Sequence, residues 1–113
     1  MAAALWPAIR AVIDNHLDTD VAVIIDGDYL LPSLDAAFDD DRVSRLWINE
    51  PSVEQIEANY RLREPAAGSQ RVRAEVSARY GHWLMSQAAA LGLTIIDARP
   101  WQDAVERAIR TVS

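Results

Sequence analysis

The stretch that most constrains this chain is VAVIIDGDYLLP at residues 21–32, where hydrocarbon side chains lead directly into two carboxylates. Residues 21–25 are apolar and mostly β-branched, which is typical of a strand buried on both faces of a parallel sheet. Asp26 and Asp28 follow where that strand should end. Because ligands of open α/β sheets bind beyond the carboxyl ends of the strands, these acids are the first candidate site residues. The alternative is that Asp26 only helps to form a turn.

Length and composition favour one globular domain, or part of one, over residues 1–113, and we treat it as a single α/β domain on the alternation of elements described below. The net charge of -6, with 17 acidic and 11 basic residues, argues against a nucleic-acid partner, which clustered cations would have to bind. The absence of cysteine excludes disulfides and thiolate chemistry. The apolar runs are too short to cross a bilayer and the N-terminus lacks the pattern of a signal peptide, so we expect a cytoplasmic protein with no membrane partner.

The basic residues are all arginines, and the chain contains no lysine. Its four glycines are scattered singly. Neither a G-x-x-x-x-G-K-[ST] loop nor a G-x-G-x-x-G loop is therefore present in this sequence.

Hydrophobic periodicity and turn residues divide the chain into alternating helices and strands. The predicted elements are helix 3–16, strand 21–26, a short helix capped by Ser33, strand 42–48, a helix capped by Ser52, helix 70–91, strand 93–97 and helix 101–112. This alternation predicts a three-layer α/β fold, with a short parallel sheet of about three strands flanked by helices.

The same periodicity predicts which side chains are buried. Helix 3–16 has one apolar face, ending at His16, which we interpret as a packed or helix-end histidine. The long helix is expected to pack through Val72, Val76, Tyr80, Trp83, Leu84 and Leu91, and the last helix through Trp101, Val105, Ala108, Ile109 and Val112. Ser52 and Gln55 have capping-box spacing, and Gly92 should end the long helix.

Four arginines flank a segment that contains Pro65 and Gly68. They are Arg61, Arg63, Arg71 and Arg73. One interpretation is a solvated surface with i,i+4 ion pairs, such as Glu57 with Arg61 or Arg71 with Glu75. The other is a lid over residues 61–73 that closes on phosphate groups, because guanidinium binds phosphate through two hydrogen bonds. The acidic triplet at 39–41 is interpreted as a solvated loop rather than a metal site.

Five segments in this order resemble small P-loop kinase-like proteins, a group that includes nucleotide and small-molecule kinases. They are VIIDGDYLLP, LWINEP, ANYRLRE, RAEVSARYGHWL and LGLTIIDARPW. The resemblance covers nearly the whole chain and corresponds to the C-terminal two-thirds of such proteins. It implies a partial P-loop kinase-like fold.

The resemblance also implies roles for individual residues. Asp26 and Asp28 would lie at the catalytic end of a central strand, with Asp28 at the magnesium shell. The four arginines would flank the lid, and Arg99 and Pro100 would border the adenine. The implied cofactors are ATP and Mg²⁺, and the implied partner is a nucleotide or small phosphorylatable molecule, with phosphoryl transfer achieved mainly by positioning and charge neutralisation.

The chain departs from that family because the first strand and the P-loop with its lysine, which should precede these segments, are absent. We therefore expect a truncated or reduced form that binds ATP weakly or not at all on its own. An uncovered sheet edge would favour a homodimer or a partner that supplies the missing P-loop half.

Two other functions fit the same residues. A strand followed by D-x-D also begins haloacid-dehalogenase-like phosphatases, in which Asp26 would be the nucleophile and Asp28 the acid/base around magnesium. The lack of lysine and the helix ahead of the strand count against that interpretation. The other alternative is a non-catalytic binding or assembly module that keeps the fold.

Overall fold

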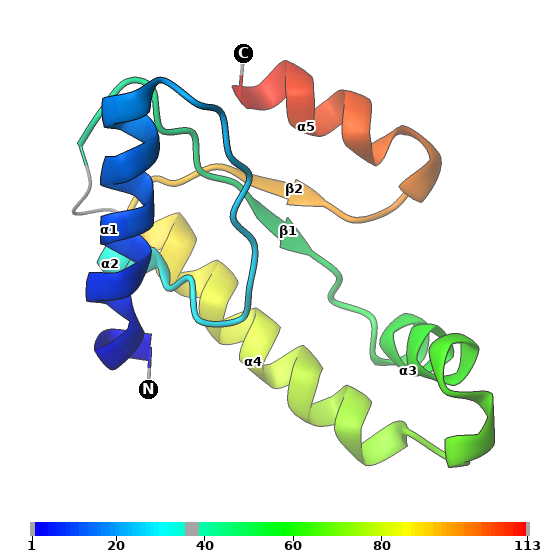
Figure 1. Cartoon of the computed structure of the whole chain (residues 1–113). Coiled ribbons are helices and arrows are strands. Elements are labelled where there is room, and N and C mark those ends of the chain that lie inside the picture. The colour runs from blue at the N-terminus through cyan, green and yellow to red at the C-terminus, as the bar shows by residue number, and fades with distance from the viewer. Residues whose placement is uncertain (1, 36–38, 113) are drawn as a thin grey trace. The chain divides into compact units, whose positions relative to one another are not determined.

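The chain separates into two compact units, residues 1–44 and residues 45–113 (Figure 1). The computed structural model describes residues 2–35 and 39–112. The second unit contains helices and a small parallel sheet, so the predicted mixed α/β class is confirmed. That the two units act as a single domain stays a prediction.

The first unit begins with α1, Ala2–Thr19, which confirms the predicted helix and extends it. The helix ends because Asp20 adopts a left-handed φ of 55°. The N–H of Val21 then donates to the carbonyl of His16 at 3.2 Å, the bond of a Schellman-type C-terminus. His16 donates from Nδ1 to the Val21 carbonyl at 2.7 Å, as expected for a helix-end histidine. No residue of α1 is fully buried, but Ile9, Ile13 and His16 on the predicted face are half-buried, so the prediction of a buried face is confirmed in part.

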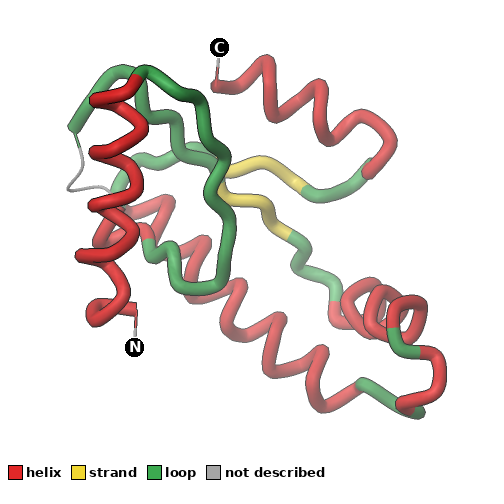
Figure 2. The backbone as a smooth tube through the Cα atoms, in the orientation of Figure 1, coloured by secondary structure: helices red, strands yellow, loops and turns green. Residues whose placement is uncertain are grey.

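The predicted strand at 21–26 is also wrong. Residues 21–27 form a loop (Figure 2). A β-branched run becomes a strand only where its backbone groups find a ladder partner, and the described residues of this unit contain no second strand. The loop leads to α2, Pro32–Asp35, at the position of the predicted short helix. The expected continuation of that helix over 36–38 lies outside the described residues.

The second unit is built on two parallel strands, β1 (Trp47–Asn49) and β2 (Ile95–Asp97). Their register pairs Trp47 with Ile95 and Asn49 with Asp97. The strands predicted at 42–48 and 93–97 are thus confirmed in part. The expectation of about three strands fails, because the described residues form a two-stranded sheet.

The crossover between the strands consists of α3 (Val53–Arg63), the short 3₁₀ turn η1 (Pro65–Ala67) and α4 (Arg71–Ala90). The helices α3 and α4 pack against each other, and α4 contacts both strands. A hydrogen bond of 2.6 Å joins the Tyr60 and Ser77 hydroxyls across the helix pair.

The predicted helix ends are largely confirmed. Ser52 caps α3, because its Oγ accepts from the N–H of Gln55 at 3.2 Å. The reciprocal half of the capping box is wrong: the Gln55 side chain donates to Asn59, and Glu50 accepts from the Ser52 N–H instead. At the end of α4, Gly92 has a φ of 67° and its N–H donates to Ala89.

The face of α4 that packs inward is not the one predicted. Ala74 and Ala88 are fully buried, and a separation of 14 residues places them on the same side of the helix. Of the predicted large apolar residues, Leu84 is half-buried and the others are exposed. We call four of the exposed residues the outer face of α4: Val72, Val76, Tyr80 and Trp83.

The last predicted helix begins with a 3₁₀ turn, η2 (Trp101–Asp103), and continues as α5 (Ala104–Val112). In Figure 1 the two strands lie between α4 and α5. The helix packs toward β2 through buried Ala104 and half-buried Ala108. The prediction that its larger apolar residues are buried is wrong. We call these exposed residues the outer face of α5: Trp101 (68% exposed), Val105 (72%), Ile109 (59%) and Val112 (41%).

Candidate functional site

The carboxyl ends of β1 and β2 form the edge at which an open parallel sheet binds ligands. Asn49 and Asp97 are register partners there, and the Ala98 N–H donates to the Asn49 carbonyl at 2.8 Å. Glu50 follows β1, and Arg99 and Pro100 follow β2. The residues for which an adenine contact was predicted therefore lie just beyond a strand end.

A two-point ion pair joins the loops at this edge. The Arg99 Nε donates to Glu50 Oε2 at 2.8 Å, and its Nη2 donates to Glu50 Oε1 at 3.0 Å. The Glu50 side chain is largely buried, whereas that of Arg99 is about half exposed. Glu50 also accepts from the Ser52 N–H at the start of α3, where a negative charge is favourable. The Glu50 carboxylate therefore already binds Arg99 and the Ser52 N–H, which could otherwise bind an external anion.

Arg107 fixes the loop that carries Arg99 and Pro100. Its guanidinium donates to the Asp97 carbonyl at 2.7 Å, to the Pro100 carbonyl at 2.8 Å and to Asp103 Oδ1 at 2.9 Å. The sequence prediction missed this residue. The i,i+4 spacing of Asp103 and Arg107 was the only signal available, and it indicates an ion pair without revealing the two carbonyl contacts.

The four predicted phosphate-binding arginines do not share one set of partners. Arg71 lies 3.3 Å from Glu54, 3.6 Å from Glu57 and 3.2 Å from Glu75. The hydrogen bond with Glu75 raises the pKa of Arg71 above its ordinary value. The predicted Arg71–Glu75 pair is confirmed, and Glu57 pairs with Arg71 rather than with Arg61.

The remaining three arginines surround Tyr60 or extend into solvent. Arg73 pairs with Glu64 and lies 4.0 Å above the Tyr60 ring, and Arg63 lies 5.1 Å from that ring. Arg61 is exposed, and in the part of the chain that the structure describes it forms no ion pair. A phosphate bound by Arg71 or Arg73 would have to compete with carboxylates that already hold them.

The predicted catalytic acids lie in the loop of the first unit, and the predicted arginines belong to the second unit. Asp26 and Asp28 are both exposed. Among the described residues, no three carboxylate or imidazole groups gather closely enough to hold a metal ion. Magnesium at Asp28 would therefore depend on phosphate oxygens and water for most of its ligands.

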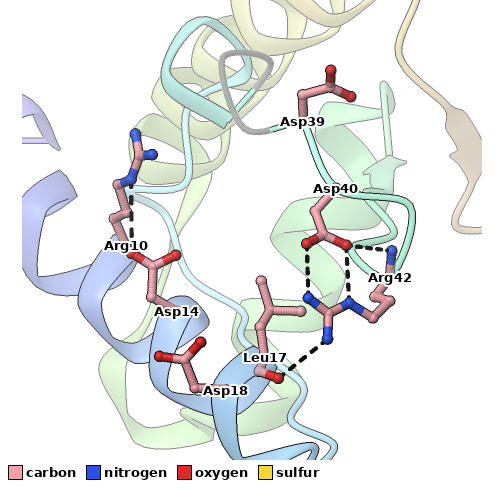
Figure 3. A pocket seen from close by; sticks show the side chains of 7 residues that line it. All are labelled: Arg10, Asp14, Leu17, Asp18, Asp39, Asp40 and Arg42. Carbon is pink, nitrogen blue, oxygen red and sulfur yellow. Dashed lines mark hydrogen bonds and ion pairs between the residues drawn. The ribbon is translucent and has the colours of Figure 1, made fainter.

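A small pocket in the first unit lies between α1 and the segment at 39–42 (Figure 3). Its volume is about 230 Å³, below the ~300–1,000 Å³ of typical small-molecule sites. The pocket is lined by Arg10, Asp14, Leu17, Asp18, Asp39, Asp40 and Arg42. The acidic triplet is in a loop, as predicted.

In this pocket Arg42 links the segment at 39–42 to the end of α1. Arg42 donates to both Asp40 oxygens, at 3.2 and 3.0 Å, and to the Leu17 carbonyl in the last turn of α1 at 3.2 Å (Figure 3). The side-chain hydrogen bond from Arg42 lowers the pKa of Asp40. The pocket is therefore explained by a structural ion pair that satisfies a helix C-terminus.

Two apolar surfaces remain in the second unit after these polar groups are accounted for. On the outer face of α4, the rings of Tyr80 and Trp83 stack with centroids 6.0 Å apart and an interplanar angle of 22°. The outer face of α5 is a separate stripe. Aromatic residues with apolar neighbours are the side chains most enriched at protein interfaces. None of the described helices is both long enough and apolar enough to cross a membrane.

Comparison with protein-family models, with curated proteins and with solved structures gave no match to this chain. The likeness to P-loop kinases therefore stays a prediction from the sequence.

Proposed function

We propose that this chain is a non-catalytic assembly module, which binds another polypeptide through the outer faces of α4 and α5. The observation that carries the proposal is the exposure of large apolar side chains on both helices, while their small residues, Ala74, Ala88 and Ala104, are buried. Exposed apolar patches of this kind mark interaction sites in folded proteins.

The polar residues support the same interpretation. Glu50 holds Arg99, and glutamates hold Arg71 and Arg73, so the groups that would bind a phosphate have internal partners. The apolar outer faces, by contrast, gain free energy only when something removes them from water.

The test substitutes glutamate on the outer faces and in the core. Val76→Glu and Val105→Glu should change the free energy of unfolding by less than about 1 kcal/mol, because both side chains are exposed. Ala74→Glu should prevent folding, because that position has no exposed surface. Urea denaturation followed by circular dichroism measures all three. A loss above about 2 kcal/mol in either outer-face variant would mean that these faces are interior, and would contradict the proposal.

A second candidate is the reduced kinase-like domain, with weak or no nucleotide binding on its own. It is favoured by the parallel pairing of β1 and β2, beyond whose carboxyl ends Glu50 and Arg99 lie. Titration with ATP and Mg²⁺ would be followed by the fluorescence of Trp101, which is two residues from Arg99 and largely exposed.

For this candidate we expect at most a weak fluorescence change that is lost in Arg99→Ala. Adding a P-loop-containing half should produce ATPase or kinase activity that falls in Asp28→Ala. Appreciable ATP hydrolysis by the pure chain would contradict a reduced form.

A further inference from the structure

The loop between α1 and α2 contains a run of backbone groups that bind no other part of the described chain. The hydrogen bonds of α1 end at Val21, whose N–H donates to the His16 carbonyl and whose own carbonyl accepts from the His16 ring. The next bond of the loop joins the Leu30 N–H to the Gly27 carbonyl. Among the described residues, no hydrogen bond involves the N–H or carbonyl of residues 22–26. These groups are therefore available to another chain.

The side chains of this run are those of a strand. Ala22 and Val23 are exposed, Ile24 is 96% exposed and Ile25 is half-buried. In a strand, Val23 and Ile25 would lie on one side and Ala22 and Ile24 on the other, so both sides would be apolar. A β-branched run with unpaired backbone groups is the kind of segment that adds to the edge of an existing sheet.

Acidic residues enclose the run at both ends. Asp20 precedes it and Asp26 ends it, both are exposed, and neither forms an ion pair within the described residues. The whole first unit, residues 1–44, contains nine acidic and two basic residues, so its net charge is -7 with the histidine neutral. A partner of this segment must therefore approach a strongly negative surface.

These charges oppose pairing of the segment with a second copy of itself. Antiparallel pairing centred on Val23 would place Asp20 of each copy opposite Asp26 of the other. Parallel pairing in register would place each aspartate opposite its own counterpart. Like charges directly opposite each other destabilise a strand pair, so both arrangements that align the apolar residues are unfavourable. The same charges favour a different protein with cations at matching positions.

We propose that residues 22–26 add as a strand to the exposed sheet edge of another protein, one whose edge strand is apolar in its middle and carries arginine or lysine at both ends. The backbone groups determine how the two chains pair, and the two aspartates determine which edge is accepted. This surface belongs to the first unit and is separate from the outer faces of α4 and α5.

A small peptide reproduces the proposed edge. The probe is a short β-hairpin closed by a disulfide between its ends, with an outer strand that reads RTVTVR, and its charge-reversed control reads ETVTVE. The disulfide cannot exchange with the protein, because the chain contains no cysteine. Titration would be followed through the ¹H–¹⁵N signals of residues 22–26 in the full chain.

The basic hairpin should bind with a dissociation constant on the order of 100 µM at low salt, because a single short strand is a small interface. Raising sodium chloride from about 20 mM to about 500 mM should weaken binding at least about fivefold by screening the aspartates. The acidic hairpin should not bind up to about 1 mM.

Neutral variants of the chain test the role of the two aspartates. The double variant D20N/D26N should weaken binding about three- to tenfold at low salt and remove most of its salt dependence. Asparagine also accepts the left-handed backbone found at Asp20, so the end of α1 should be kept. The matched control is D39N/D41N, which removes the same charge from exposed positions of the same unit outside the segment and should change the constant less than about twofold.

N-methylation of the outward-facing amides of the RTVTVR strand tests backbone pairing, because it removes the donors and leaves the charge unchanged. Binding should then weaken at least about tenfold. Val76→Glu and Val105→Glu should bind the unmodified hairpin as the parent does, since both lie on the outer faces of the second unit. Failure of this proposal therefore leaves the proposed assembly function untouched.

The inference is overturned if the basic hairpin does not bind up to about 1 mM, if the acidic hairpin binds equally well, or if D20N/D26N or N-methylation leaves the constant unchanged. It is also overturned if the signals of residues 22–26 move when the chain alone is diluted from about 1 mM to 50 µM, because the segment would then pair with a second copy.

Discussion

Gly81 is the residue at which a single methyl group should stabilise the protein. It lies inside α4, and a Cβ built there meets no atom within 4 Å. Alanine is favoured over glycine in a helix interior, so Gly81→Ala should raise the free energy of unfolding by about 0.5–1 kcal/mol. Urea denaturation followed by circular dichroism would measure the gain.

Gly92 provides the matched control, because Gly92→Ala makes the same chemical change at a φ of 67°. There alanine is strained, and stability should fall by about 1 kcal/mol. A decrease for Gly81→Ala instead would show that α4 approaches a neighbour closely at that point.

The ion pair of Asp40 with Arg42 should make the first unit sensitive to acid. The hydrogen bond from Arg42 lowers the pKa of Asp40 below its unfolded value. The pair therefore stabilises the fold above the unfolded pKa, near 3.8, and that contribution is lost as the pH falls through the lower folded pKa. We expect the melting temperature of the parent to fall more steeply than that of Asp40→Asn between about pH 5 and pH 2.

Arg10→Gln is a control for the same unit, since Arg10 and Asp14 are 3.9 Å apart and both exposed. It should leave the acid transition nearly unchanged. If Asp40→Asn followed the same pH profile as the parent, the pair would carry no stability.

Residue-scale predictions from the sequence held where the chemistry is local. Ser52 caps its helix and Gly92 ends one, because each needs only neighbouring backbone groups. The capping role of Gln55 failed because Glu50 competes for the same N–H and is itself held by Arg99. That competition depends on a residue 49 positions away, which no local pattern reveals.

At the scale of elements, Arg71 should contribute most to the connection between α3 and α4. It lies near three glutamates, two on α3 and one on α4. Arg71→Ala should lower the free energy of unfolding, and the loss should shrink at high salt because exposed ion pairs are screened. Chemical denaturation at low and high sodium chloride would measure both effects.

Arg61→Ala is the matched control, because Arg61 is exposed on the same helix pair and forms no ion pair within the described residues. Its effect should stay within about 0.5 kcal/mol. Equal losses for the two variants would mean that the glutamates around Arg71 contribute little.

Helices were predicted better than strands and better than the faces they bury. Periodicity located α1, α3, α4 and α5 because a helix makes its backbone hydrogen bonds within one segment. The apolar run at 21–25 had the composition of a strand but lacks a partner in its unit. On α4 the close packing of Ala74 and Ala88 decided which side turns inward, although the larger residues carry more apolar surface.

The candidate site was predicted in the same uneven way. The position of Arg99 and Pro100 beyond a strand end could be predicted, because the sequence of β2 itself indicates a strand. Asp26 and Asp28 were grouped with the arginines because a strand was predicted at 21–26, and that strand does not form. The distance between these acids and the arginines could therefore not be predicted. The partners of Arg71 and Arg107 arise from tertiary contacts and from helix register.

At the scale of the whole molecule, the second unit contains the groups a folded domain needs. Trp47, Ala74, Ala88 and Ala104 form its buried set, and Glu50 with Arg99 and Tyr60 with Ser77 link its elements. We therefore predict that a polypeptide of residues 45–113 folds without residues 1–44. Its two-dimensional ¹H–¹⁵N spectrum should reproduce the positions of most of its amide signals in the full chain.

Unfolding provides the quantitative form of this prediction. Residues 45–113 should unfold cooperatively in urea, with a slope smaller than that of the full chain because less surface is exposed. Trp47→Ala is an internal control: it removes a large buried side chain from this unit's core and should cost about 3–5 kcal/mol, enough to abolish the transition. Collapsed amide dispersion in the parent fragment would contradict the prediction, because the core of residues 45–113 would then require residues 1–44.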